Sequence, residues 1–247
     1  MNFRLDASYQ LDANNSIGAN FGFLRNPKQT WNGDMSSSIL QDEELSESSD
    51  SHADFFWQKN NLSSNIYYVG KIGKLSIDFN TDWLWSKEYQ NDVTKEQYQE
   101  VGMNAQSQTA HSLTNKDYHL LASKLVLSYP LLGGNLSLGG EYSNTHRTSK
   151  YQVVPTNLVS DDDSRITESM TSSFLTYSRD FGNLSLEAGL RYEYINFNYY
   201  EYGKYVPGQS KSYGNWFPSI SLSMPAGKVQ MQLSYATDID RPSYHYL

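Results

Sequence analysis

Residues 184–194 read LSLEAGLRYEY, and the fold class of the whole chain follows from the way these letters alternate. Every second residue from Leu184 to Tyr194 is aliphatic or aromatic, whereas the residues between them are Ser, Glu, Gly, Arg and Glu. Successive side chains of a β-strand point to opposite faces, so one face of this segment is apolar and the other is polar. The segment therefore predicts a long β-strand that lies between two different surroundings.

The same period-two alternation recurs along the chain. It is clearest in residues 3–11, 75–85, 136–143, 216–224 and 229–235. No window shows an apolar stripe of helical period, and none approaches the roughly 18 consecutive apolar residues of a membrane-spanning helix. The alternation also runs longer than the about five or six residues of an average soluble strand. The sequence predicts an all-β fold of antiparallel strands.

The composition indicates what surrounds the two faces. Only 38% of the 247 residues are hydrophobic, yet 20 Tyr, 10 Phe and 5 Trp are present. A transmembrane β-barrel has this balance, because only its outer face is apolar and its aromatic rings gather at the two lipid interfaces. A soluble, Tyr-rich β-sandwich has a similar composition. The apolar rows end in aromatic rings, at Trp83, Tyr142, Tyr192 and Trp216, and the opposite face carries charges, which favours the barrel.

The connections between the predicted strands alternate in length. Tight connections fall at residues 12–16, 70–74, 130–135, 180–183 and 225–228, and long polar ones fall near 26–54, 87–115, 149–164 and 201–213. Outer-membrane barrels have short periplasmic turns and long extracellular loops, so residues 1–247 are predicted to form a single up-and-down transmembrane β-barrel segment of roughly ten strands. Residues 111–128 and 165–179 break the alternation, which leaves their registers open.

Several classes of function and site are disfavoured by the composition. The chain has no cysteine, which removes disulfides and thiolate metal sites, and its five histidines show no paired ligand spacing. We therefore predict no metal and no other cofactor. A formal net charge of −8 without a basic patch argues against a nucleic-acid partner. The first residues, MNFRLD, do not have the form of a signal peptide.

Four segments together resemble a known family. Residues 234–247 read SYATDIDRPSYHYL and contain Arg241, Pro242, Ser243 and Tyr244. This run is similar to a recurrent strand, S-Y-S-R-R-I-x-R-P-S-Y, of Bacteroidetes TonB-dependent receptors, in the group called the outer membrane protein β-barrel family. Ala-Thr-Asp at 236–238 departs from the usual basic pair. Residues 216–223 (WFPSISLS), 186–193 (LEAGLRYE) and 128–143 resemble further strands of that family, so the resemblance covers the chain from about residue 118 to its end.

The resemblance implies a function and partners. Members of the family are receptors with a plug domain, a segment that contacts TonB and a barrel of about 22 strands. The chain is accordingly expected to be an incomplete, open barrel, a fragment of the C-terminal half without the plug domain. Its expected partners are outer-membrane lipid, the rest of the receptor and, through the missing N-terminal part, TonB. The expected role is import of a glycan, a peptide or a metal chelate across the Gram-negative outer membrane, without enzymatic activity.

Aromatic residues in the long connections are the candidate ligand contacts. Phe55, Phe56 and Trp57 lie at the end of the first connection, and Tyr199, Tyr200 and Tyr202 lie at the last one. Such rings can stack on a ligand, or they can form the aromatic girdle at the outer lipid interface.

Catalytic and calcium sites have little support. Asp238, Asp240 and His245 lie close together in sequence, as in rim proteases, but catalysis needs a second carboxylate pair across the opening. The acidic runs at 161–163 and 42–50 lack the spacing and glycine of a calcium loop. No catalytic residue is predicted.

Two other functions remain open at this point. The first is a complete ten-stranded barrel that acts as a rim protease or an adhesin, and it requires residues 3–11 to pair with residues 229–237. The second is a soluble carbohydrate-binding sandwich, and it requires two sheets packed face to face.

Overall fold

The computed structural model describes residues 1–155 and 159–238, most of which lie in β-strands. The strands are β1 (Asn2–Asp12), β2 (Asn15–Gln41), β3 (Glu44–Ile72), β4 (Leu75–Glu100), β5 (Gln106–Leu131), β6 (Gly134–Val154), β7 (Asp162–Phe181), β8 (Leu184–Glu201), β9 (Lys204–Tyr205), β10 (Lys211–Ala226) and β11 (Val229–Ala236). One short 3-10 helix, η1 (Pro207–Gln209), precedes β10. No helix in the described ranges is long and apolar enough to cross a membrane.

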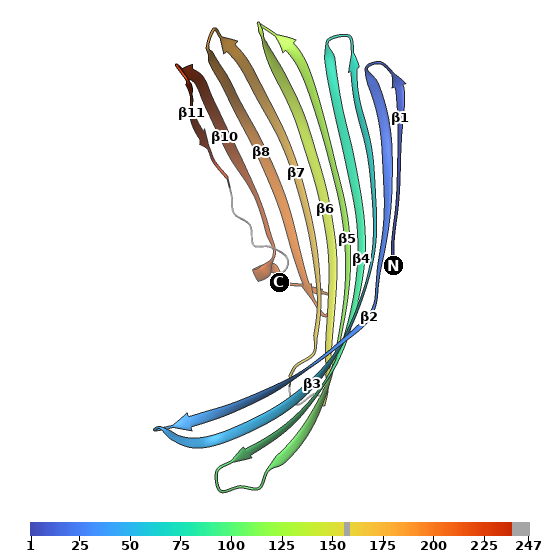
Figure 1. Cartoon of the computed structure of the whole chain (residues 1–247), viewed down its shortest axis with the longest axis vertical. Coiled ribbons are helices and arrows are strands. Elements are labelled where there is room, and N and C mark those ends of the chain that lie inside the picture. Colours follow the sequence, from blue (N-terminus) through green and yellow to red (C-terminus); the bar gives the residue numbers. More distant parts are fainter. Residues whose placement is uncertain (156–158, 239–247) are drawn as a thin grey trace.

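The 11 strands form one antiparallel sheet. Ten of them follow one another in chain order, and β9 pairs with β8 beside this path. Figure 1 shows the result as a curved meander in which each strand lies beside its neighbours in sequence. The predicted up-and-down topology is confirmed. The sandwich alternative is wrong, because the described residues belong to a single sheet and no second sheet covers it.

All five predicted tight connections are confirmed as two-residue turns. They join β1 to β2, β3 to β4, β5 to β6, β7 to β8 and β10 to β11, and they lie together at one end of the sheet (Figure 1). Gly73, Gly133, Gly182 and Gly227 take φ values between 62° and 76° in four of them. Two-residue hairpin turns of this kind need positive φ, which glycine adopts without a steric cost.

The first two long polar connections, near 26–54 and 87–115, are by contrast wrong as loops, because most of their residues continue the strands, whereas the connections near 149–164 and 201–213 do contain non-strand segments after β6 and β8. β2 and β3 run on to a turn at Asp42–Glu43, and β4 and β5 run on to residues 101–105. At about 3.3 Å per residue, the 29 residues of β3 reach about 95 Å. A hydrocarbon core is only about 30 Å thick, so the strands extend far beyond it. We call residues 26–59 and 86–116 the distal extensions.

The strand register assigns every side chain to one of two faces. Ile77, Leu127, Leu138, Leu175 and Leu190 are direct partners across β4 to β8 and form one apolar row. All residues predicted for the apolar face share this face: Leu75, Ile77, Phe79, Leu136, Leu138, Leu184, Leu186, Leu190, Ile220, Leu222, Met231 and Leu233. The predicted two-faced character of the sheet is confirmed.

The opposite face is polar. Gly18, Tyr67, Asn80, Lys124 and Glu141 are direct partners across β2 to β6, and the row continues through β7 and β8 to β10. The residues predicted for this face lie on it: Asp78, Asp82, Glu141, Glu187, Arg191, Glu193 and Gln232. The registers left open by the sequence are now defined, with Phe174 on the polar face and Leu175 on the apolar face.

A single curved layer cannot bury its own apolar face. Among the described residues, only Val153, Ile166 and Ile195 are buried hydrophobics, whereas Leu190 and Leu233 are 46% and 73% exposed. Exposing this apolar surface to water costs a large amount of free energy, whereas contact with lipid does not. The absence of a packed core in the described part thus agrees with a sheet that faces hydrocarbon.

Both edges of the sheet are open. Within the described residues, β1 pairs only with β2 and β11 pairs only with β10. The predicted open barrel segment is therefore confirmed, since residues 3–11 and 229–237 share no ladder.

Candidate functional site

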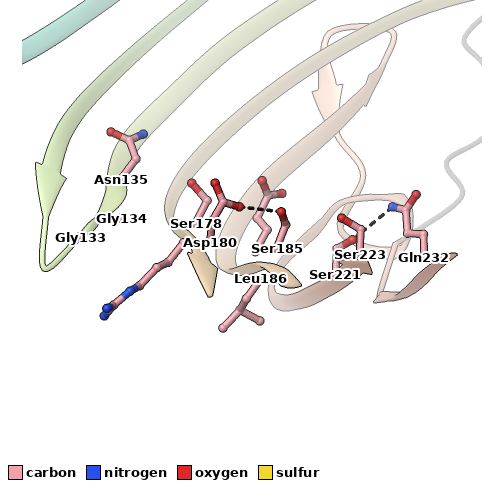
Figure 2. A pocket seen from close by; sticks show the side chains of 12 residues that line it. Gly133, Gly134, Asn135, Ser178, Asp180, Ser185, Leu186, Ser221, Ser223 and Gln232 are labelled. Atoms are coloured by element: carbon pink, nitrogen blue, oxygen red, sulfur yellow. Dashed lines mark hydrogen bonds between the residues drawn. The ribbon is translucent and has the colours of Figure 1, made fainter. Parts of the chain in front are cut away.

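Near the turns, the polar face is the concave side of the sheet. A hollow of about 460 Å³ is lined there by residues from the β5–β6 turn across to Gln232 on β11. In Figure 2, the side chains of Asp180, Ser185 and Gln232 lie on the same face of the sheet as the hollow, whereas the side chain of Leu186 points to the opposite face. Ser185 donates a hydrogen bond to Asp180 at 2.6 Å, and Gln232 donates one to Ser221 at 3.2 Å. Hydroxyl, carboxamide and carboxylate groups make this surface suited to hydrogen bonding with a polar partner.

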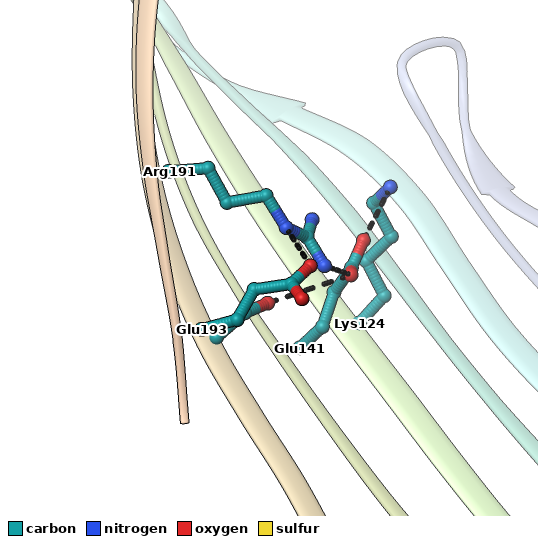
Figure 3. Close-up of polar contacts among 5 residues, drawn as sticks. Lys124, Glu141, Arg191 and Glu193 are labelled. Carbon is teal, nitrogen blue, oxygen red and sulfur yellow. Dashed lines mark hydrogen bonds and ion pairs between the residues drawn. The ribbon is translucent and has the colours of Figure 1, made fainter. Parts of the chain in front are cut away.

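Four charged side chains form a network at mid-strand on the polar face (Figure 3). Glu141 accepts from Lys124 at 2.7 Å and from Arg191 at 2.5 Å, and the same guanidinium lies 2.6 Å from Glu193. Strands β5, β6 and β8 are thereby joined across the concave side. The two cations balance the two carboxylates, so the cluster carries no net charge that would attract an ionic ligand. Its observed role is to hold the wall together.

Aromatic rings on the polar face lie over glycines of the neighbouring strand. The ring of Phe174 occupies the space that a side chain at Gly139 would fill, with ring atoms 2.1–2.7 Å from the position of a Cβ. Tyr67 covers Gly18 in the same way. Lys124 and Arg191 lie 5.5 and 5.8 Å from the centre of the Phe174 ring, within cation–π range. The Phe174 ring therefore packs against the two cations of the charged network. This contact explains why an aromatic residue interrupts the polar row.

The aromatic residues predicted at 55–57 divide between the two faces. Phe55 and Trp57 lie on the polar face, opposite Trp31 and Gln29 of β2, and Phe56 lies on the other face. The rings of Trp31 and Phe55 meet edge to face, with centroids 4.3 Å apart. Together with Gln29, Thr30, Trp57 and Gln90 they line a hollow of about 720 Å³, which we call the aromatic hollow. Phe56 instead lies under the ammonium of Lys28, at 4.0 Å.

The predicted residues near 200 do not come together with those at 55–57. Tyr199 lines a separate hollow of about 370 Å³ on the polar face, with Arg147, Ser164 and Ile166. Tyr200 lies on the opposite face, where the guanidinium of Arg165 covers its ring at 4.0 Å. Tyr202 occupies the turn after β8, and its hydroxyl donates to the backbone oxygen of Asp161.

Four residues of the aromatic hollow were not predicted from the sequence: Gln29, Thr30, Trp31 and Gln90. They lie in segments that were expected to be loops, and they are brought together only by strand pairing across the distal extensions. Trp31 is paired with Phe55 by a turn at Asp42–Glu43 together with a register shift between Ile39 and Leu40, and the two turn residues are not the Asn-Gly or Asp-Gly that marks such a turn. The sequence carries no usable signal for this hollow.

Other candidate residues fall outside what the structure describes. Arg241, Pro242, Ser243 and Tyr244, the strand motif of the resemblance, lie beyond the described ranges, as do Asp240 and His245. Within residues 1–155 and 159–238, no group of three His, Asp or Glu side chains is arranged to hold a metal ion.

Comparison with protein families gives a match over most of the chain. Residues 68–247 match the model of the "Outer membrane protein beta-barrel family". No curated protein sequence shows significant similarity to the chain.

Several solved structures are similar in part. The alcaligin outer membrane receptor FauA from Bordetella pertussis is 12% identical, with a TM-score of 0.40, and the match covers 95% of this chain and 42% of FauA. The ferric citrate transporter FecA is 11% identical, with a TM-score of 0.43 and coverage of 91% and 42%. The copper transporter OprC is 7% identical, with a TM-score of 0.45 and coverage of 98% and 45%. The chain thus spans less than half the length of these proteins.

Proposed function

Because the chain belongs to the outer membrane protein β-barrel family and resides in the outer membrane, we propose that it forms part of the wall of a TonB-dependent receptor of Bacteroidetes type. The receptor imports a nutrient, which is a glycan, a peptide or a metal chelate. The wall itself performs no catalysis, and transport depends on a plug domain and a TonB-contacting segment in addition to residues 1–247.

The open sheet is the observation that carries this proposal. β1 and β11 each expose one edge of unpaired backbone groups among the described residues. In hydrocarbon, each unsatisfied backbone group costs several kcal/mol, so a membrane-spanning sheet must close on itself. Further strands that pair with β1 and β11 satisfy these groups, and a wider barrel then surrounds a lumen lined by the polar face.

The polar hollow near the turns fits the proposed plug domain. Its lining of Ser178, Asp180, Ser185, Ser221 and Ser223 offers short hydrogen-bonding groups that face the lumen. A folded domain inside the barrel needs such partners, because its own surface is polar. The apolar face has lipid as its partner.

Cysteine cross-linking tests whether the two edges close on each other. The chain contains no cysteine, so pairs can be introduced freely. Leu222→Cys with Leu233→Cys is the positive control, because these residues are direct partners on β10 and β11. Leu5→Cys with Leu233→Cys probes the edges. We expect a disulfide in the control pair only. Efficient cross-linking of the edge pair within one polypeptide would contradict the open wall and favour the complete ten-stranded barrel.

Uptake measurements test the import itself. Cells that lack the gene, and cells that lack TonB, are compared with the parent strain for growth on candidate glycans, peptides and metal chelates. We expect the same nutrient to be lost in both deletions. A nutrient phenotype that persists unchanged when TonB is removed would exclude energised import through this receptor.

A further inference from the structure

We propose that the aromatic hollow binds the pyranose ring of an uncharged saccharide, a capture step outside the membrane that rests on the import function proposed above. The hollow is lined by Gln29, Thr30, Trp31, Phe55, Trp57 and Gln90. Its volume of about 720 Å³ lies within the about 300–1,000 Å³ usual for small-molecule sites.

The indole ring of Trp31 provides a flat apolar platform, and the ring of Phe55 stands at 84° to it. Trp31 is 62% exposed, although its ring is fixed edge to face against Phe55 at 4.3 Å. A ring that is both held in place and open to solvent loses little entropy when a ligand covers it. One face of a pyranose presents a patch of C–H groups, which packs against an indole face as other apolar groups do. The platform therefore matches a sugar ring in shape and polarity.

The carboxamides provide the polar half of the site. The amide nitrogen of Gln90 donates to Asp92 at 2.7 Å, which leaves the Gln90 carbonyl oxygen as an acceptor at the hollow. Gln29 makes no side-chain hydrogen bond within the described residues, and it adds both a donor and an acceptor. Sugar hydroxyls both donate and accept, so a mixed set of neutral partners suits them.

The uncharged lining of the aromatic hollow selects against ionic ligands. None of the six lining residues is ionisable. Lys28, the nearest cation on β2, is held over the ring of Phe56 on the opposite face. Asp92 accepts from Gln90 through its Oδ2, whereas its buried Oδ1 has no hydrogen-bond partner among the described residues. Anionic chelates and charged peptides are recognised chiefly through charge-assisted hydrogen bonds, which this lining lacks.

The position of the hollow excludes the lipid girdle as its explanation. Phe55 lies 17 residues along β3 from Ile72, or about 56 Å at the rise of a β-strand. A strand needs only about 9–11 residues to cross the membrane. Phe55 and Trp57 also share the polar face with the lumen, so lipid does not reach them.

A glycan array probed with outer-membrane vesicles tests the proposal. Vesicles carry the native protein, Trp31→Ala, Gln90→Leu or the control Tyr200→Ala, which removes a half-buried ring near the end of β8, outside the hollow. The array holds neutral and acidic glycans. We expect the native protein to bind neutral glycans and Tyr200→Ala to bind equally well. Loss of one stacking ring should weaken binding about tenfold in Trp31→Ala.

The outcomes separate this inference from the import function. Absence of binding to any neutral glycan, a preference for acidic glycans, or unchanged binding by Trp31→Ala would each overturn the saccharide site. Uptake in whole cells is measured in parallel. Binding of a neutral glycan that is never accumulated in a TonB-dependent manner would leave the site standing and refute the import function instead.

Discussion

Leu190 lies on the apolar face between Leu175 of β7 and Pro218 of β10. It lies six positions after Leu184, the first residue of β8, so it is near the middle of a membrane crossing. We expect Leu190→Arg to lower the free energy of unfolding by about 2–4 kcal/mol, the cost of a cation near the midplane of a barrel. Urea unfolding in detergent measures this cost. Thr176→Arg, on the polar face beside Gly189, is the matched control and should cost much less.

Gly139 shows how one missing side chain makes room for a ring. Gly139→Ala places a Cβ into the Phe174 ring, and overpacking of this kind costs about 1–3 kcal/mol. Gly140→Ala is the control, because its Cβ has its nearest neighbour at 3.6 Å. Gly139→Ala should cost less stability when it is introduced into the Phe174→Ala variant than when it is introduced into the native protein. A Gly139→Ala protein as stable as Gly140→Ala would contradict the packing described here.

His52 gives the distal extension a dependence on pH. Its Nδ1 lies 2.6 Å from Asp34 and its Nε2 lies 3.6 Å from Asp54, while Lys95 is its partner on β4. The hydrogen bond with Asp34 raises the pKa of His52 above its usual 6.5, with the charge of Asp54 adding to the effect. A raised pKa means that the pair stabilises the hairpin fully below about pH 6.5 and that this stabilisation fades as the pH rises through the raised value.

An NMR titration checks this expectation. The His52 ring signals should titrate above pH 6.5 in the native protein, and Asp34→Asn should bring the midpoint down towards 6.5. Asp54→Asn should have the smaller effect, because its carboxylate is farther away. A midpoint that Asp34→Asn leaves unchanged would show that the contact does not form in solution.

At the scale of the strands, the two ends of each hairpin belong to different compartments. The short turns are expected on the periplasmic side and the distal extensions outside the cell. We expect a membrane-impermeant maleimide to label Ser38→Cys in intact cells, and to label Asn14→Cys only after the outer membrane is permeabilised. Ser38 lies in distal β2 and Asn14 lies in the turn between β1 and β2. The reverse pattern would invert the orientation of the whole sheet.

The strands also show which features could be predicted from the sequence. β8 was predictable because its two faces meet different surroundings, so Leu184 to Tyr194 alternate strictly. The alternation fails at Phe174 because that ring lies on the polar face over Gly139, a pairing that one strand alone cannot reveal. It disappears in the distal extensions, where water surrounds both faces and no residue type is excluded from either. Phe55 and Trp57 could be predicted as ligand contacts, but Trp31 as their neighbour in the aromatic hollow could not.

At the scale of the whole molecule, the open edges predict how the chain behaves alone. β1 and β11 are long edge strands whose residues are exposed throughout. Such edges pair readily with other chains. We expect residues 1–247 expressed alone to form dimers or larger assemblies in detergent, as measured by light scattering. A stable monomer would contradict the free edges, and co-expression of strands that complete the barrel should suppress assembly.

The continuity of β2 and β3 also constrains how the outer surface of the protein can evolve. A one-residue insertion in either strand turns every following side chain to the other face unless a bulge absorbs it. β2 contains such a bulge at Pro27–Lys28, and a second register shift leaves Ser46 of β3 without a partner in the ladder. Trp31, between the two, faces Phe55. Length can otherwise change freely only at the Asp42–Glu43 tip, where residues added in matched pairs lengthen both strands. Divergence among relatives should thus accumulate as hairpins that grow or shrink from their tips, with the ladder beneath them kept in register.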